Sequence, residues 1–144
     1  KTYGLAGIRV GYGFASPEVA DALNRAREPF NVNSLAQVAA IAALEDRAHI
    51  ERTVAHNAAQ RDRLSEAFRR HGFKPVESYA NFVLADLGSP ARPLFDALLR
   101  KGVITRCGDV LGLPNTLRVS VGTELEMDRF EEALASCVAA ATPS

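Results

Sequence analysis

The chain opens with Lys1-Thr2-Tyr3-Gly4-Leu5-Ala6-Gly7-Ile8-Arg9-Val10-Gly11-Tyr12, which holds its most informative residues. The amine of Lys1 can form a Schiff base with an aldehyde. The guanidinium of Arg9 offers several fixed donors to a phosphate, and interleaved glycines let the backbone pass close to a bound ring. By spacing alone, a solvated lysine at a chain start is the more common interpretation. The set also fits an aldehyde cofactor that carries a phosphate.

The order of these residues resembles a known signature, S-K-x-Y-G-L-A-G-x-R-x-G-Y, from its lysine onward. That signature is typical of pyridoxal-phosphate aminotransferases of the aspartate-aminotransferase fold, and within them the stretch is most similar to histidinol-phosphate aminotransferases. The resemblance implies that Lys1 is the catalytic Schiff-base residue and that Lys1 and Arg9 bind pyridoxal 5'-phosphate. Tyr3 and Tyr12 belong to the same signature and are interpreted as packing residues around the pocket.

The position of this signature in the chain leads to an expectation about length. The chain begins at the lysine, whereas the similar proteins carry more than half of their length before it. We therefore expect the 144 residues to be the C-terminal part of a longer enzyme, inactive in isolation because most of the cofactor pocket would precede it. The resemblance also implies a homodimer.

Composition excludes several other classes. The chain has 17 basic and 17 acidic residues, so its formal net charge is zero and nothing indicates a nucleic-acid or anionic-membrane partner. No apolar run approaches the roughly 20 residues that span a membrane. Cys107 and Cys137 match no metal or redox spacing. His49 and His56 lie two helical turns apart, too far to share an ion, so no metal is expected, and a reduced cytoplasmic setting is the default.

The first part of the chain is expected to finish a large cofactor-binding domain, over residues 1–46. Ser16-Pro17-Glu18 is typical of a helix start, with a cap, a proline in the first turn and an acid at the positive end. We expect a buried strand and two helices here, over 8–14, 17–28 and 34–46, with Asn33 or Ser34 capping the last helix.

Residues 47–144 are expected to form a connecting helix and a small C-terminal domain. A long helix over 47–71 is predicted to end at Gly72, and Thr123-Glu124-Leu125-Glu126 matches a capping box. The pattern predicts strands over 73–76, 79–86, 103–106 and 117–121, helices over 91–101 and 124–140, and a frayed end at 142–144. A few strands covered by helices make an α/β fold, α+β in this C-terminal part.

Arg118 and Arg106 are the candidate substrate residues. Arg118 lies on the polar side of an alternating strand, where an arginine needs an anionic partner or water; from the pattern alone an edge position in water is equally possible. Residues 117–123 resemble the L-R-[VI]-[TS]-[VI]-G-T segment of histidinol-phosphate aminotransferases, and 102–114 resemble their G-[VI]-x-x-R…G-L-P segment. The resemblance implies that both arginines bind a substrate phosphate, whereas in the wider superfamily the equivalent of Arg118 grips a carboxylate.

Two further residues qualify this prediction. Tyr79-Ala80-Asn81-Phe82 resembles the A-N-F segment of the same family, which would place Asn81 at the substrate mouth. An asparagine that bonds to strand backbone explains the same residue equally well. Asp109 departs from the commoner family pattern and brings a negative charge near the expected anion site.

The favoured function is transamination between histidinol phosphate and 2-oxoglutarate, in histidine biosynthesis. An aromatic-amino-acid aminotransferase and a threonine-phosphate decarboxylase share the same signatures and stay open. A different class is also open, because aminotransferase-like domains occur in transcription regulators. An aspartate and a stacking aromatic residue upstream of Lys1 would indicate the enzyme, and a winged-helix segment would indicate the regulator.

Overall fold

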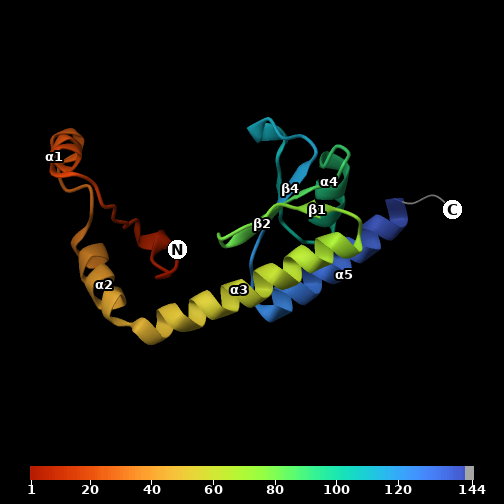
Figure 1. The fold of residues 1–144 in the computed structure, drawn as a ribbon, viewed down its shortest axis with the longest axis horizontal. Coiled ribbons are helices and arrows are strands. Elements are labelled where there is room, and N and C mark those ends of the chain that lie inside the picture. Colours follow the sequence, from red (N-terminus) through yellow and green to blue (C-terminus); the bar gives the residue numbers. More distant parts are fainter. Residues whose placement is uncertain (142–144) are drawn as a thin grey trace. The chain divides into compact units, whose positions relative to one another are not determined.

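The computed structural model describes residues 1–141, so the expected frayed end at 142–144 lies outside the described part. The chain forms two compact units, one over Lys1–Val54 and a second that starts at Ala55. The division falls inside a helix, eight residues after the domain boundary expected at residue 46. The two units are taken one at a time, and their elements are labelled in Figure 1.

The first unit contains a short 3-10 helix η1 (Ala6–Ile8) and the helices α1 (Pro17–Ala26) and α2 (Ser34–Glu45). Both α-helices start at the predicted caps. The Ser16 hydroxyl accepts from the Val19 N–H at 3.5 Å, and the Asn33 side chain accepts from the Ala36 N–H at 2.8 Å. A side-chain acceptor at this position satisfies an otherwise unpaired donor of the first turn, so local sequence signals define these helices.

The expectation of a buried strand over residues 8–14 is wrong. The segment begins in η1, turns at Arg9 with φ 61°, and continues without regular structure, with Phe14 95% exposed. A strand needs a neighbour for its backbone groups, and no strand within residues 1–141 pairs with this segment. The sequence also places Leu35, Val38, Ala39 and Ala42 on one apolar face of α2, but Leu35 is exposed in this unit and the buried residue is Ala36.

The long helix α3 (Arg47–Arg70) matches the predicted helix to within one residue. Gly72 follows it at φ 77°, the left-handed conformation that ends many helices. The sequence predicts an apolar stripe along this helix through Ile50, Val54, Ala58, Leu64 and Phe68, and only part of it is buried. Leu64 and Phe68 are fully buried, whereas Val54 is 55% exposed. Within the second unit, α3 therefore contributes its C-terminal half to the core.

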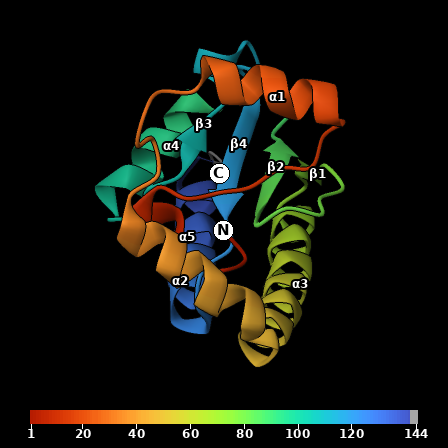
Figure 2. The same cartoon turned by 90° about the vertical axis from the view of Figure 1, so that its left-hand side faces the viewer.

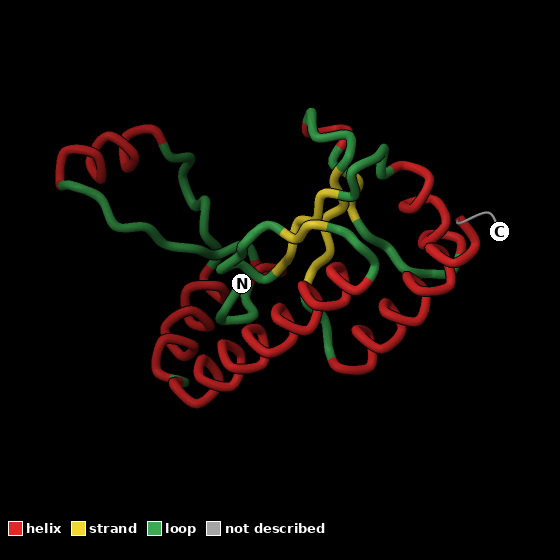
Figure 3. The backbone as a smooth tube through the Cα atoms, turned by 45° about the vertical axis from the view of Figure 1, so that its right-hand side comes forward, coloured by secondary structure: helices red, strands yellow, loops and turns green. Residues whose placement is uncertain are grey.

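The second unit is built on a four-stranded antiparallel sheet in the order β1-β2-β4-β3. The four strands are labelled in Figure 2 and are coloured yellow in Figure 3. The strands are β1 (Lys74–Pro75), β2 (Phe82–Asp86), β3 (Arg106–Cys107) and β4 (Thr116–Ser120). β1 and β2 are shorter than predicted, and β4 has the predicted length but begins one residue earlier. β3 overlaps the strand expected over 103–106 only at Arg106, and it pairs with β4 at two positions.

One face of this sheet carries the core. Val83 and Ala85 of β2 and Leu117 and Val119 of β4 are buried there, and for β4 this is the alternation that the sequence predicted. The helices α4 (Arg92–Arg100), α5 (Glu124–Ala141) and the end of α3 cover this face. The small-domain fold class is therefore confirmed. The largest fully buried side chains are Phe68, Leu64, Leu98, Leu117, Met127, Leu134 and Val83.

Two local features fix α5 in place. The predicted capping box is confirmed: the Glu126 carboxylate accepts from the Thr123 N–H at 2.7 Å, and the Thr123 hydroxyl accepts from the Glu126 N–H at 3.3 Å. Arg63 of α3 reaches Asp128 and Glu131 of α5, each at 2.6 Å. These ion pairs join two helices that run side by side in Figure 1.

Candidate functional site

In the first unit, a tight loop carries Lys1 and Arg9. The Gly4 N–H donates to the Lys1 carbonyl at 2.9 Å, and Gly4 takes a φ of 70° that favours glycine. Arg9 also adopts a left-handed conformation, uncommon for a residue with a side chain. Its Nη1 donates to the Ala6 carbonyl at 2.9 Å, which holds the guanidinium on the loop. Both side chains are exposed in this unit.

Tyr3 and Tyr12 meet across the same loop. Their hydroxyls lie 3.4 Å apart and their ring centroids 6.4 Å apart. The hydrogen bond with Tyr12 is the main reason that the pKa of Tyr3 is raised above its usual value. Tyr12 in turn meets Phe14 edge to face at 5.5 Å. The contact between the two signature tyrosines thus connects the two ends of the Lys1–Tyr12 loop.

In the second unit, the sheet register brings the two predicted substrate arginines together. Arg106 of β3 is the Cα partner of Arg118 of β4, so both side chains stand on the same face, opposite the core. Directly opposed residues of an antiparallel pair have Cβ atoms about 4.5–5.5 Å apart, and like charges there are destabilising. An anion between or beside the two guanidinium groups would therefore relieve their repulsion.

The described residues 1–141 place no carboxylate in a salt bridge with either arginine. Arg118 instead lies over the ring of Phe82, with its Cζ 4.8 Å from the ring centroid. The edge position considered for Arg118 is wrong, because β4 lies between β2 and β3 and Arg118 is half-buried.

Asp109, the acid expected near the anion site, has a partner of its own. Arg92 at the start of α4 donates to its Oδ2 through Nε at 2.9 Å and through a second, shorter contact from Nη2. This bond lowers the pKa of Asp109 and raises that of Arg92. Its charge is balanced by Arg92, so Asp109 does not argue against an anion at Arg106. Nothing in the spacing of these residues predicted this pair.

Asn81 immediately precedes β2 and is exposed. Its backbone carbonyl accepts from the Val121 N–H at 2.9 Å. Its side chain makes no hydrogen bond to any residue in the range 1–141, so the alternative of a side chain bonded to strand backbone finds no support. Sequence reasoning missed its neighbour Phe82, which it assigned only to the apolar centre of a strand. No signal in the sequence marked it, because its contact with Arg118 depends on the register between β2 and β4.

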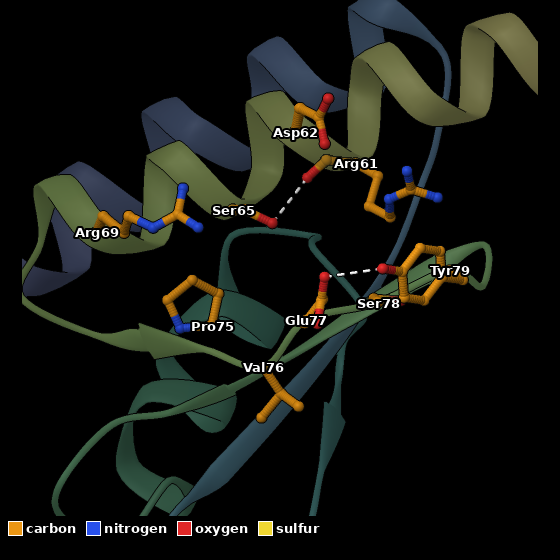
Figure 4. A pocket seen from close by; sticks show the side chains of 9 residues that line it. All are labelled: Arg61, Asp62, Ser65, Arg69, Pro75, Val76, Glu77, Ser78 and Tyr79. Atoms are coloured by element: carbon orange, nitrogen blue, oxygen red, sulfur yellow. Dashed lines mark hydrogen bonds between the residues drawn. The ribbon is translucent and has the colours of Figure 1, made fainter.

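Two grooves of the second unit have linings that do not include the arginine pair. One, of about 450 Å³, runs between α3 and residues 75–79 and is lined by both signs of charge (Figure 4). There Tyr79 donates to Glu77 at 2.8 Å, and Ser65 donates to the Arg61 carbonyl at 2.9 Å. The other, of about 410 Å³, lies between residues 102–105 and 119–122 over α5. Neither includes Arg106 or Arg118, which stand on the open face of the sheet.

A small sheet backed by helices and a lysine–arginine loop are features of one class of protein. The chain belongs to the aminotransferase class I and II family, whose model matches residues 1–134. The helix-backed sheet is that of the C-terminal part of the aminotransferase fold. In residues 1–141, none of the helices is long and apolar enough to cross a membrane.

Within this family, the chain is similar to curated proteins named histidinol-phosphate aminotransferase. The chain is 58% identical to histidinol-phosphate aminotransferase 2 of Methylococcus capsulatus over 134 residues, 93% of this chain and 36% of that protein. It is 49% identical to histidinol-phosphate aminotransferase of Moorella thermoacetica over 139 residues, again 36% of that protein. The chain therefore spans a little over a third of the length of these curated relatives.

Solved structures of histidinol-phosphate aminotransferases also align with this chain. Histidinol-phosphate aminotransferase from Sinorhizobium meliloti in complex with pyridoxal-5'-phosphate aligns with a TM-score of 0.90 at 32% identity, over 99% of this chain and 40% of that one. The enzyme from Clostridium acetobutylicum aligns with a TM-score of 0.87 at 30% identity, over 97% of this chain and 44% of that one.

Proposed function

We propose that the intact protein carrying this chain is a pyridoxal-phosphate aminotransferase that exchanges an amino group between histidinol phosphate and 2-oxoglutarate, in histidine biosynthesis. The family and the names of the similar proteins support the reaction class and the substrate. The observation that carries the substrate choice is the pair of opposed arginines, Arg106 and Arg118, without a carboxylate partner. Two guanidinium groups suit a phosphate dianion because each can donate a forked pair of hydrogen bonds.

The residues of the first unit fit the cofactor. Lys1 provides a primary amine for an aldehyde, and Arg9 provides a guanidinium for a phosphate. Only one donor of Arg9 is used by the Ala6 carbonyl, and no salt bridge within residues 1–141 uses Lys1 or Arg9. Neither group is therefore neutralised by a neighbour. The donor set matches an aldehyde that carries an anionic group.

The roles of the residues follow from this chemistry. Pyridoxal phosphate, when bound, supplies the electron sink that makes the carbon next to the amino group acidic. Arg9 holds the phosphate of the cofactor, and Lys1 is its point of covalent attachment. The Nζ atom of Lys1, when not bonded to the cofactor, would take the proton from that substrate carbon and later give it up, as base and then acid. Arg106 and Arg118 fix the substrate phosphate, with Asn81 at the substrate mouth.

Steady-state kinetics on the intact protein test the substrate assignment. The values to compare are kcat/KM for histidinol phosphate, histidinol and phenylalanine, in the unmodified protein and in Arg106→Ala and Arg118→Ala. Loss of one charge-assisted hydrogen-bonding group should cost about tenfold to a hundredfold with histidinol phosphate and little with histidinol. Arg100→Ala is the matched control, because Arg100 is an exposed arginine at the end of α4 without a salt bridge.

Each rival function gives a different result. An unmodified enzyme that prefers phenylalanine would be an aromatic aminotransferase, with Arg118 on a carboxylate. An unchanged histidinol-phosphate value in Arg106→Ala would rule out the two-arginine site. For the cofactor, borohydride reduction and peptide mapping should label Lys1, and a label on Lys74 or Lys101 alone would contradict the assignment.

We also infer from the family resemblance that the intact protein is a cytoplasmic homodimer. For the 144 residues alone we infer no turnover. Light scattering of the intact protein tests the dimer. Turnover by the isolated chain at ordinary enzyme rates would contradict the inference about the 144 residues. In the isolated chain Lys1 also carries an α-amine, which can react with aldehydes unassisted, so activity and not labelling is the measurement there.

A further inference from the structure

We propose that Phe82 is a positioning residue of the substrate-anion site, whose ring holds the Arg118 guanidinium while leaving its N–H donors free. This proposal rests on the proposed function, because it takes Arg106 and Arg118 as the phosphate site. Phe82 begins β2, and its Cα partner is Ser120 of β4, two residues from Arg118. The ring thus approaches Arg118 diagonally across the strand pair, within reach for an aromatic side chain.

The contact has the geometry of a cation–π interaction. The Arg118 Cζ lies 4.8 Å from the Phe82 ring centroid, inside the range of about 6 Å in which the ring quadrupole attracts a cation. Phe82 is half-buried, and the neighbouring Val83 is fully buried in the core. The backbone that carries the ring is therefore fixed by the packed face of the sheet, and Arg118 has a rigid platform.

A ring serves an anion site better than a carboxylate would. A carboxylate bound to Arg118 would occupy its N–H donors and cancel its charge. A phenyl ring has no lone-pair acceptor, so it limits the motion of the guanidinium without using the donors. An arginine side chain loses rotamer entropy when it is fixed. Fixing it before the substrate arrives moves that cost out of the binding step.

A second arginine of the same unit shows the contrast. Arg92 also lies over a phenyl ring, with its Cζ 5.1 Å from the centroid of Phe95, but its donors are taken by Asp109. Arg92 thus has a ring and a carboxylate, whereas Arg118 has the ring alone. The two arginines share one kind of support and differ in whether their charge is available. Phe95 is therefore the matched control for Phe82.

The test uses the intact protein, with KM and kcat for histidinol phosphate and the inhibition constant of inorganic phosphate as readouts. Phe82→Leu removes the ring and should raise both KM and the inhibition constant about threefold to tenfold, the effect of one cation–π contact, with kcat nearly unchanged. Phe82→Tyr keeps a ring and should restore both values. Phe95→Leu should leave both unchanged, because Asp109 still holds Arg92. Phe82→Met repeats the test if the leucine variant does not fold.

The outcomes separate this proposal from the proposed function. If Arg118→Ala weakens phosphate binding while Phe82→Leu and Phe82→Met do not, the positioning role is wrong and the anion site stands. If Phe82→Tyr loses as much as Phe82→Leu, the ring is not the cause and the proposal is also overturned. If the unmodified protein does not turn over histidinol phosphate, the proposed function fails, and the phosphate inhibition constants still decide whether Phe82 acts on Arg118.

Discussion

The two units of the chain differ in how their elements are held. Within Lys1–Val54, Ala36 is the only buried hydrophobic residue, and Phe14 and Phe30 are 95% and 98% exposed. In the second unit, up to residue 141, one cluster joins buried residues of α3, α4, α5 and three strands. Helix caps and turns define the first unit, whereas apolar burial, which dominates folding free energy, defines the second.

The comparison matters for the site. Lys1 and Arg9 lie on a loop shaped by hydrogen bonds and two left-handed residues. Arg106 and Arg118 lie on a sheet whose opposite face is fully packed, so their spacing is set by strand register. The two arginines proposed to bind the substrate phosphate are thus held more rigidly than the two residues proposed to bind the cofactor. Four measurements would break or sharpen this contrast.

The largest effect is expected from removing a phenyl ring in each unit. In the 144-residue chain, Phe68→Ala should lower the free energy of unfolding by about 3–5 kcal/mol, because a fully buried ring leaves a cavity. Phe30→Ala should change it by less than about 0.5 kcal/mol, since that ring is exposed. Urea unfolding followed by circular dichroism measures both. Equal losses in the two variants would show that the contrast between the units is wrong.

A methyl group added to the backbone should also discriminate between the units. At Gly108 a Cβ would lie 2.1 Å from the Thr116 hydroxyl oxygen and 2.5 Å from the Leu113 carbonyl oxygen. Gly108→Ala should therefore cost about 1–3 kcal/mol, the range for overpacking. At Gly11 no atom lies within 4 Å of the added Cβ, so Gly11→Ala is the control. A Gly108→Ala protein as stable as the control would mean that the loop after β3 is not closely packed.

Loss of a helix cap should act globally in one unit and locally in the other. Thr123→Ala removes the cap of α5, which packs into the core, and should lower the unfolding free energy by about 1 kcal/mol. Ser16→Ala removes the cap of α1, which buries no residue. There we expect faster amide hydrogen exchange in the first turns of α1 and an unchanged unfolding midpoint. A shifted midpoint in Ser16→Ala would tie α1 to the global transition.

The smallest effect concerns acid. The Thr123 N–H and hydroxyl both bond to the Glu126 carboxylate and lower its pKa. A carboxyl group whose pKa is lower in the folded state than in the unfolded state stabilises the protein. This contribution is fully present at pH values above the unfolded-state pKa, which is near 4.3 for glutamate. That contribution is lost as the pH falls through the folded pKa. Unfolding of the unmodified chain and Glu126→Gln, compared from about pH 3 to about pH 7, should show a weaker acid loss in the variant. Parallel curves would exclude this role.

Much of the fold could be predicted from local signals. The caps at Ser16, Asn33 and Thr123, and the glycine after α3, all lie where the sequence placed them, because a cap involves residues only a few positions apart. The errors lie where a partner was needed. The strand expected at 8–14 has no neighbour to pair with, and the apolar side of α2 does not face a core in this unit.

The sequence by itself determined the candidate residues Lys1, Arg9, Arg106 and Arg118, whose amine and guanidinium groups are of the types that can bind an aldehyde or a phosphate. Only the tertiary structure decided that Arg106 and Arg118 are cross-strand partners, that Arg92 neutralises Asp109, and that Phe82 supports Arg118. The physical reason is distance along the chain. Chemistry and caps are written in adjacent residues, whereas strand register and charge pairing join residues that the chain brings together only on folding.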